Sequence, residues 1–412
     1  MDDLASRILD FNKDRIRSLV GLKYEAMAEN MYRFFRGTNH IFFGDMTTGI
    51  DLPPSPNAWI SGDLHLENFG SYKSDNRLVY FDLNDFDEGF LAPVIWDLYR
   101  MVVSILIAFA SLGIEEEKAE RMGKLFLKTY SDTLMKGKAD YIEPKTAKGI
   151  VCEFLTAVSK RKQRDILRKK TVKHKNKLEI LLDDPKHLGL KKSLKKDLMN
   201  HITAWLKNDS NSPYNYKVMD AVFRLAGTAS LGTTRFAILL KSLNTTGEKY
   251  LLLDMKEAIP SSLEPYSDVR QPAWLSEADR IVTVQRYLQN RSPALLSTTE
   301  FRDRHFVIQE IQPAKDKINF KLIKKEYRSI YQVIADMASL TAYAHLRSSG
   351  RQGSAIADDL ISFGKETNWQ DDVFHSAVRY AFQLENDYKQ YMADYRSGIF
   401  KVEHTEDMKI SA

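Results

Sequence analysis

Carboxylate side chains gather in two short segments near the start of the chain, and each segment follows an apolar run. The segments are SGDLHLENFG, residues 61–70, and VYFDLNDFDEG, residues 79–89. Carboxylates this close repel one another unless a cation compensates their charge. In phosphoryl-transfer sites an Asn and one or two Asp usually hold Mg²⁺, with phosphate and water at the other positions. The two segments therefore predict a Mg²⁺ site. The alternative is an acidic surface loop with helix-capping aspartates.

A second arrangement, further along the chain, suits phosphate. The turn Gly227-Thr228-Ala-Ser230-Leu-Gly232 joins two predicted strands, and a third predicted strand carries Lys256. Backbone N–H groups of such a turn, together with a lysine, can cover phosphates. Alone, the pattern also fits a β-hairpin turn and an edge-strand lysine. Beside the acidic segments it supplies the donors that a metal-bound phosphate needs, so we predict a phosphate site.

The segment SGDLHLEN resembles the catalytic loop of aminoglycoside-phosphotransferase-like and choline-kinase-like enzymes. The resemblance implies that Asp63 orients or deprotonates the acceptor hydroxyl and that Asn68 holds Mg²⁺. Asp82 stands at the spacing at which those families place a metal-binding Asp. Asp85 is the alternative, because Asp85-Phe86-Asp87 resembles the metal-binding tripeptide of protein kinases. The chain departs from the pattern at Ser61, where many relatives carry His.

Further segments resemble an uncharacterised bacterial family, domain-of-unknown-function family 2252, over nearly the whole chain. They are RFFRGT (33–38), GDLHLENFG, FDLNDFDEG, GTASLG, MKEA, VQRYLQ (284–289) and AHLRSSG (344–350). The family is named for the lack of an established activity, so this resemblance supports the kinase-like interpretation without supplying a function. Trp96-Asp97-Leu98 is similar to the segment that opens the buried helix of the kinase large lobe, where the Asp is structural.

The elements that must position these residues follow from hydrophobic periodicity. Residues 1–35, 96–130, 320–347 and 371–396 are predicted as helices, and residues 150–207 continue in helical style. Strands are predicted at 58–60, 78–81, 218–226, 235–241, 250–256 and 305–311, with a helix at 275–289. The predicted fold class is α+β.

The order of the motifs is the reverse of that in ordinary kinases, because Asp63 precedes the glycine turn and Lys256. We therefore expect a circularly permuted, two-lobed protein-kinase-like fold, which is permissible where the original termini lie close together. Residues 1–213 would form a helical large-lobe half, 214–318 a small antiparallel-sheet lobe, and 319–412 the helices that complete the large lobe. Residues 310–312 would form the hinge, where the backbone beside Glu310 meets adenine.

Several residues keep two interpretations at this stage. Glu277 is a candidate partner for Lys256, although Gln285 sits in the better-matched motif. His65 either contacts phosphate or substrate or packs in the loop. Arg36 either contacts an anion or pairs with an acid. A helix-end, structural role is favoured for His345, and inert packing is favoured for the single cysteine, Cys152.

Composition bounds the class of protein. A chain of 412 residues with 43% hydrophobic residues has enough apolar side chains for real cores, which excludes disorder. One cysteine cannot form an internal disulfide, so a reducing compartment, the cytoplasm, is expected. The apolar run at 101–114 is shorter than the roughly 20 residues of a membrane span. Lys and Arg outnumber Asp and Glu over 160–196, but few aromatics lie among them, which weakens a nucleic-acid interpretation.

Together these features predict an ATP- and Mg²⁺-dependent phosphotransferase acting on an unknown hydroxyl-bearing acceptor, a small molecule in preference to a protein. A nucleotide-binding pseudokinase and a nucleotidyl transferase are the alternatives. Gly62-Asp63-Leu64-His65 also resembles a segment of two-metal phosphoesterases, but that interpretation leaves Lys256 and the glycine turn unexplained. The sequence does not indicate an oligomeric state.

Overall fold

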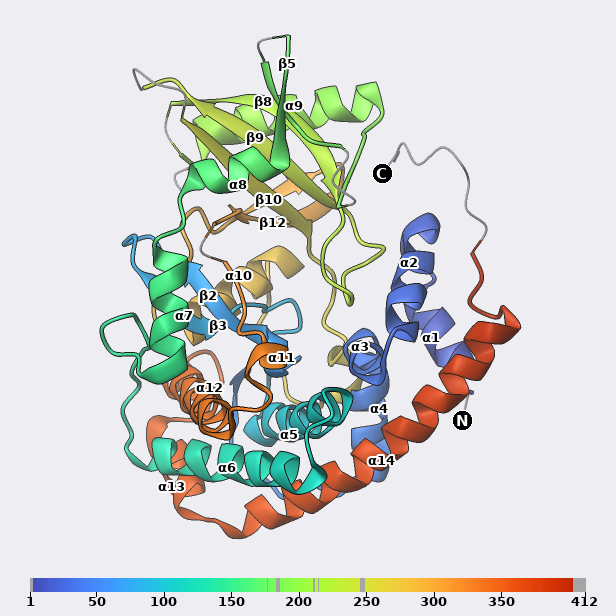
Figure 1. Ribbon diagram of the computed structural model, residues 1–412, viewed down its shortest axis with the longest axis vertical. Helices are drawn as coiled ribbons and strands as arrows, with labels where there is room; N and C mark the ends of the chain where they lie inside the picture. The colour runs from blue at the N-terminus through green and yellow to red at the C-terminus, as the bar shows by residue number, and fades with distance from the viewer. Residues whose placement is uncertain are drawn as a thin grey trace.

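The computed structural model describes residues 3–175, 177–182, 186–209, 212–213, 215–244, 249–313 and 315–402. It combines a body of helices with an antiparallel sheet, so the predicted α+β class is confirmed (Figure 1). The sheet lies at one end of the molecule, above the helices in this view. The segment Asn208-Asp-Ser-Asn-Ser-Pro213 is rich in turn formers and suits a linker, and two of its residues, 210 and 211, lie outside the described residues.

The large sheet has the strand order β11-β12-β10-β9-β8-β7, and every neighbouring pair is antiparallel. Side chains of a strand alternate between its two faces. On β10, Leu251, Leu253 and Met255 therefore enter one core, and Leu252 enters the core on the opposite face. The strands are β7 (His187–Leu188), β8 (Tyr216–Arg224), β9 (Arg235–Ser242), β10 (Tyr250–Glu257), β11 (Ser297–Phe301) and β12 (Arg304–Glu310), with α10 (Glu277–Leu288) between β10 and β11.

The segment that precedes β8, residues 163–208, is called the insert, and it covers both faces of this sheet. Helix α9 (Lys192–Asn208) packs on one face, and α8 (Gln163–Lys170) packs on the other beside the hairpin of β5 (Thr171–His174) and β6 (Lys177–Ile180). The hairpin corrects the prediction that residues 150–207 are helical. Leu178 and Ile180 alternate with polar residues, and that period of two suits a strand packed on a sheet. The insert also belongs with the sheet, not with the helical half to which 1–213 was assigned.

The helical body surrounds α5 (Val94–Ser111). This helix is long and apolar enough to cross a membrane, but 83% of its residues are buried inside the protein, which is typical of the core helix of a soluble protein. Around it lie α1 (Leu4–Asn12), α2 (Arg17–Ala28), α3 (Met31–Gly37), α4 (Asn39–Gly49), α6 (Glu116–Met135), α7 (Gly149–Ser159), α11 (Phe320–Ile323), α12 (Tyr327–Ser348), α13 (Ala357–Lys365) and α14 (Asn368–Ser397).

The helix predicted over residues 1–35 is three helices. It breaks first before α2, where the backbone N–H of Ile16 donates to the carbonyl of Gly232 instead of to its own helix (2.8 Å). It breaks again at Asn30, whose side chain accepts the N–H of Arg33 at the start of α3. Both interruptions follow from contacts or caps that hydrophobic periodicity does not reveal.

Two short two-stranded antiparallel sheets lie between the helical body and the large sheet. Strand β1 (Asn57–Ile60) pairs with β4 (Phe90–Pro93), and β2 (Phe69–Lys73) pairs with β3 (Val79–Leu83). The segment that follows β12 runs along β2, because Ser71 N–H donates to the carbonyl of Asp316 at 2.8 Å. The segment that follows α12 runs along β1, because Ala355 N–H donates to the carbonyl of Asn57 at 2.7 Å. Two single-turn 3₁₀ helices are Leu66–Asn68 and Glu264–Tyr266.

Stability should depend on pH through Asp336, a half-buried carboxyl on α12. Burial raises its pKa to about 7 from 3.8, and Lys148 opposes the rise. The folded protein thus keeps a proton that the unfolded chain releases near pH 4, so stability falls as the pH rises towards 7. We expect Asp336→Asn, which stays neutral, to be more stable than the parent by about 1–3 kcal/mol at pH 8 and by little at pH 4. Urea unfolding at both pH values measures this; equal pH dependence in both proteins would contradict it.

Candidate functional site

The loop of residues 61–70 is held in place by Asp97, in the first turn of α5. Its carboxylate accepts the backbone N–H groups of Ser61 at 2.8 Å and Gly62 at 3.0 Å. Gly62 has φ +72°, and a Cβ there would lie 2.1 Å from the carbonyl oxygen of Glu88, so only glycine fits. A buried carboxylate and an obligatory glycine thus fix the direction in which the loop leaves β1.

His345 supports the same carboxylate from α12. Its Nε2 lies 3.8 Å from Asp97 Oδ2, and its Nδ1 is hydrogen-bonded to the hydroxyl of Tyr130 at 2.8 Å. All three side chains are buried. These contacts confirm the structural role predicted for His345, and they give Asp97 the structural role that the kinase resemblance implies.

Asp63 is paired with Arg100, a fully buried arginine of α5. Arg100 Nε and Nη2 donate to the same oxygen, Asp63 Oδ1, at 2.7 and 2.6 Å. The guanidinium also lies over the rings of Phe35 and Phe42, 4.1 and 4.7 Å from their centroids. Burial raises the pKa of Asp63, and the positive charges of Arg100 and Arg36 oppose the rise. Arg100 therefore holds the carboxylate by one oxygen; Oδ2 takes no part in this pairing and lies 3.7 Å from Nε2 of His65.

His65 and Glu67 are residues of the same loop, and both side chains pair with Arg36 of α3. Arg36 Nε donates to His65 Nε2 at 3.1 Å, and Nη1 bonds the carboxylate of Glu67 at 2.5 Å. Burial and the charge of Arg36 hold the pKa of His65 well below its usual value, so the ring is neutral. Arg36 thus pairs with an acid, and His65 is a buried support of the loop.

Asn68 joins the two acidic segments. Its amide nitrogen donates to the carbonyls of Asp63 and Asp85, each at 3.2 Å. Its amide oxygen accepts the N–H of Asp85 at 2.8 Å and that of Asn84 at 3.3 Å. Because two backbone N–H groups donate to this oxygen, Asn68 sets the position of the Asp85 segment. The same two hydrogen bonds occupy the oxygen with which Asn68 was predicted to bind Mg²⁺.

The two candidate metal aspartates occupy different surroundings. Asp82, on β3, is 2% exposed, and its carboxylate accepts from Leu83 N–H and pairs with Arg347 at 3.4 Å. The side chain of Asp85 is 59% exposed and lies 3.8 Å from Lys256. The structure therefore brings Asp85, not Asp82, together with the other candidate residues.

Lys256 reaches from β10 to the second acidic segment. Its ammonium bonds the carboxylate of Asp87, and Asp85 lies next to it. The predicted pairing of Glu277 with Lys256 is wrong, because Glu277 pairs with Arg280 at 2.6 Å. Arg280 in turn donates to the carbonyls of Asp87 and Gly89, at 2.9 and 2.6 Å, so α10 holds the acidic segment from behind.

The glycine turn between β8 and β9 contacts Arg15, in the short segment between α1 and α2. Gly227 and Gly232 have φ of +79° and +93°, and a Cβ on Gly232 would lie 2.9 Å from Cβ of Arg15. Arg15 Nη1 donates to the carbonyls of Ala229 and Leu231, at 2.5 and 2.9 Å. The turn thus has the predicted position between two strands, and an arginine that the sequence did not single out closes it.

One cavity of about 40 Å³ is lined by residues of the 61–70 loop, the second acidic segment, the glycine turn and β10 with the residues that follow it, together with Arg15. Its lining residues are Arg15, Ser61, Asp63, Asp85, Asp87, Glu88, Ala229, Ser230, Thr233, Lys256, Glu257 and Ile259. The cavity brings together four of the predicted site residues, namely Asp63, Asp85, Ser230 and Lys256. The others do not line it: His65, Asn68, Asp82, Gly227, Thr228, Gly232, Glu277 and Glu310. Arg15 and Arg100 were missed, because only the folded chain brings Arg15 to the glycine turn and Arg100 to Asp63. The sequence places Asp87 in the second acidic segment, and the structure pairs it with Lys256.

The carboxylate oxygens of this cavity could supply some of the ligands of a hard cation, but not all of them. Among the described residues, no group of three or more His, Cys, Asp or Glu side chains is placed to hold a metal ion on its own. Mg²⁺, however, is commonly bound by one or two carboxylates with substrate phosphates and water. Asp85 lines the cavity with its side chain 59% exposed and lies 3.8 Å from Lys256, so it meets that requirement.

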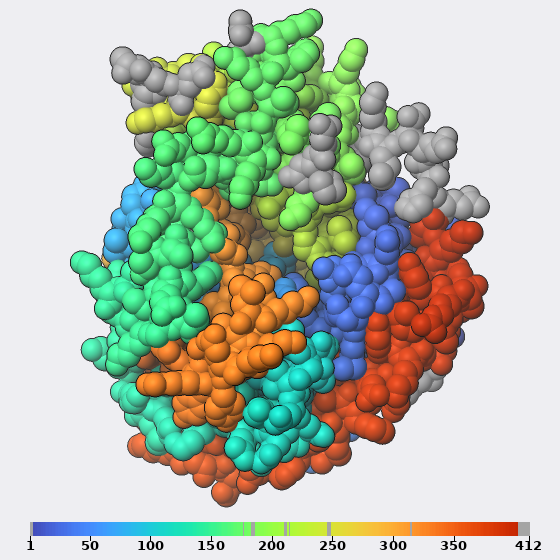
Figure 2. Space-filling view, in the orientation of Figure 1, coloured from blue at the N-terminus to red at the C-terminus, as the bar shows by residue number. Residues whose placement is uncertain are grey.

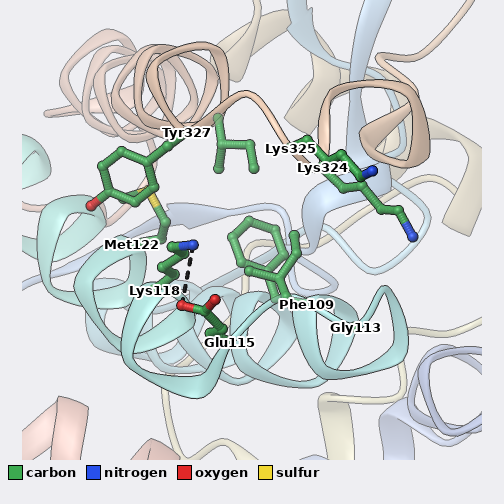
Figure 3. Close-up of a pocket in the computed structure, with 10 residues that line it drawn as sticks. Phe109, Gly113, Glu115, Lys118, Met122, Lys324, Lys325 and Tyr327 are labelled. Atoms are coloured by element: carbon green, nitrogen blue, oxygen red, sulfur yellow. Dashed lines mark ion pairs between the residues drawn. The ribbon is translucent and has the colours of Figure 1, made fainter.

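A larger cavity, of about 270 Å³, lies elsewhere in the helical body (Figure 3). It is bordered by the end of α5, the start of α6 and the segment that leads into α12. Figure 3 shows Lys118 paired with Glu115 at one side and Lys324 and Lys325 at the other, above Phe109. None of the predicted site residues lines this cavity, so its size does not make it the site of the chemistry.

Comparison with known proteins gives one match. The family model described as an uncharacterized protein conserved in bacteria, DUF2252, matches residues 15–394. No curated protein matches the chain, and no solved structure does.

Proposed function

Because that match covers most of the chain, the protein belongs to the bacterial family DUF2252, and we propose that it is an ATP- and Mg²⁺-dependent phosphotransferase that acts on a hydroxyl acceptor. The observation that carries the proposal is the shared cavity. Asp63 and Asp85 reach it from the helical body, and Lys256 and Ser230 reach it from the sheet. A general base, a metal carboxylate, a phosphate cation and a glycine turn are the parts that phosphoryl transfer requires.

A permuted kinase-like fold is the architecture we propose. Strand, glycine turn, strand, lysine strand and helix follow one another in β8, β9, β10 and α10, and in protein kinases the lysine likewise stands on the third strand. The chain after α12 hydrogen-bonds to β1, which leads into the loop of Asp63. Joining the two there would restore the ordinary order of motifs. The small lobe would include the insert, so that its boundary lies near residue 160 instead of 213.

The proposed step places the acceptor hydroxyl against Asp63 Oδ2. The hydroxyl oxygen forms a bond to the terminal phosphorus of ATP while the bond from that phosphorus to the bridging oxygen breaks, and ADP leaves. The hydroxyl proton passes to Asp63 and then to solvent. Lys256 and the N–H groups of the glycine turn stabilise the phosphate oxygens. Mg²⁺, held by Asp85 and the phosphates, would neutralise the charge that develops on those oxygens.

The acceptor and the location are proposed from the cavity and from the single cysteine. A cavity enclosed by both parts of the molecule favours a small hydroxyl compound over a protein chain. A single free cysteine, Cys152, suits the reducing cytoplasm. A pseudokinase and a nucleotidyl transferase stay as alternatives; the first predicts binding without turnover, and the second predicts release of pyrophosphate in place of ADP.

The proposal is tested by thermal unfolding of the full chain with ATP, ADP or AMP, each with and without Mg²⁺. A ligand that binds only the folded state raises the midpoint, by about 3 kcal/mol of stability at a hundred times its Kd. We expect ATP with Mg²⁺ to stabilise the protein most. If no nucleotide stabilises it, the kinase-like function is wrong.

Asp85 and Asp82 give a matched pair of variants for the metal. We expect Asp85→Asn to weaken ATP binding in Mg²⁺ about tenfold and to leave binding without Mg²⁺ unchanged, because Asp85 faces the cavity. Asp82→Asn should instead lower the unfolding midpoint, because Asp82 is buried against Arg347. Calorimetric titration of ATP with and without Mg²⁺ measures the difference; a Mg²⁺ effect confined to Asp82→Asn would assign the metal to Asp82.

A further inference from the structure

The face of β10 that carries Lys256 can be followed away from the cavity. Alternate residues share a face, so Asp254 and Leu252 lie on the same side as Lys256. Leu252 is next to the end of β12, where its carbonyl accepts the N–H of Ile311 at 2.8 Å. A nucleotide with its phosphates at Lys256 would therefore extend its ribose and base past Asp254 towards Leu252 and Ile311.

The middle of this path is occupied by a buried ion-pair cluster. Asp254 is bound by Arg235, whose Nε donates at 2.8 Å, and by Arg224, which lies 2.8 Å away. The two arginines hold the pKa of Asp254 well below its usual range, so it stays ionised. Charged groups this well paired are costly to separate, so the cluster leaves no apolar surface against which a sugar or base could pack.

The far end of the path is covered by the insert. Ile166 and Leu167 of α8 and Leu178 and Ile180 of β6 pack on the sheet residues of that face. The residues they cover are Ala237, Leu239, Leu252 and Ile311. In Figure 1, α8 lies across the sheet at this level, and in Figure 2 the insert, in green, covers the sheet. One backbone group of the hinge predicted to meet adenine is engaged as well, because Ile311 N–H is bonded to the Leu252 carbonyl of β10.

The cations along the same face suit phosphates. Lys256, which pairs with Asp87, stands at one end, and Arg235 and Arg224, which share Asp254, follow it. Lys315, exposed on the segment after β12, interacts electrostatically with Asp85, Asp254 and both arginines. With Asp85, this face carries four cations against three carboxylates, and a net positive surface attracts a polyanion. The described residues thus provide a track for a chain of phosphates and no apolar slot for a purine.

Resting on the function proposed above, we propose that the donor is recognised by its polyphosphate chain alone, so that the site accepts nucleoside triphosphates of any base and inorganic tripolyphosphate. With tripolyphosphate the transfer stays balanced. The acceptor oxygen bonds to a terminal phosphorus, the bond to the bridging oxygen breaks, pyrophosphate leaves, and the hydroxyl proton goes to Asp63. Because the cavity has a volume of only about 40 Å³, the donor enters it only if the lining rearranges.

Calorimetric titration of the full chain in excess Mg²⁺ tests this with ATP, GTP, inorganic tripolyphosphate and adenosine. We expect the first three to bind with Kd values within about tenfold of one another, which is 1.4 kcal/mol, and adenosine not to bind. ATP binding more than tenfold tighter than both GTP and tripolyphosphate would overturn the inference and leave the proposed function standing. Binding of tripolyphosphate but not of ATP would contradict both, because the inference requires nucleoside triphosphates to bind as well. Binding of neither would overturn both.

A lysine pair separates phosphate recognition from general charge effects. Lys315→Gln removes a cation from the track, and Lys321→Gln removes an exposed lysine at α11 as the matched control. We expect Lys315→Gln to weaken ATP and tripolyphosphate by the same factor, about fivefold, and Lys321→Gln to change neither. A loss for ATP alone, or for neither ligand, would contradict a donor site built on these phosphate contacts.

Discussion

Replacing Asp63 by asparagine is expected to abolish phosphoryl transfer while ATP binding is kept. Asn has the size of Asp, and its oxygen still accepts from Arg100, but it cannot take the proton of an acceptor hydroxyl. General-base catalysis contributes about 10²–10⁴-fold to such reactions, so turnover should fall by about 10³-fold. Phosphate release from ATP, with and without a pool of small hydroxyl compounds, measures turnover. Calorimetric titration measures binding.

The control for this variant has to address stability. Neutralising Asp63 leaves the buried Arg100 without its counter-charge, which costs about 3–5 kcal/mol. Retained ATP binding shows that the variant is folded. Asp75→Asn, a change of the same chemistry at an exposed residue, should leave turnover unchanged. If Asp63→Asn turns over at the parental rate, Asp63 is not the base, whatever the rest of the site does.

Replacing Gly62 by alanine is expected to destabilise the whole fold. At φ +72° a side chain is strained by about 1–2 kcal/mol, and the added Cβ would lie 2.1 Å from the backbone oxygen of Glu88. A backbone oxygen cannot turn aside as a side chain does, so the loop or the Glu88 segment must move. We expect a loss of about 4 kcal/mol or more in the free energy of unfolding, measured by urea denaturation.

Gly113 isolates the effect of that contact. Its φ of +69° matches that of Gly62, but a Cβ there would meet no atom within 4 Å. Gly113→Ala should therefore cost only the backbone strain, about 1–2 kcal/mol. Equal losses for the two variants would mean that the contact with Glu88 contributes nothing, and that the loop of Asp63 tolerates displacement.

Elements with a clear period were predictable. Alternation along 218–226, 235–241 and 250–256 predicted β8, β9 and β10, because their two faces enter two separate cores. The apolar stripe of 371–396 predicted α14 for the same reason. Short strands were missed: β2, β4, β7 and β11 have five residues or fewer, too few for a period to be seen. The β5–β6 hairpin was hidden in a run of lysines, whose charge suggested an exposed helix.

The site was predictable as far as its chemistry is local. Asp63 and Asp85 stand in segments whose residue types already indicate a metal and a phosphate. The partners were not predictable, because Arg15 contacts a turn beyond residue 225 and Lys256 contacts Asp87 across the whole insert. The position of the insert over the sheet was also not predictable from the sequence. Its many lysines indicate an exposed segment, whereas the buried contacts are made by a few apolar residues such as Ile166 and Leu167.

The core around α5 has a consequence for how the chain folds during synthesis. Its apolar side chains come from both ends of the sequence: Tyr24 and Phe34 pack with Tyr391 and Phe400. Such contacts close the longest loops in the protein, and folding that depends on distant contacts is slow. The first half of the chain therefore leaves the ribosome with α5 uncovered and must wait for α14. We expect the nascent chain to need protection by chaperones until the last helix is made.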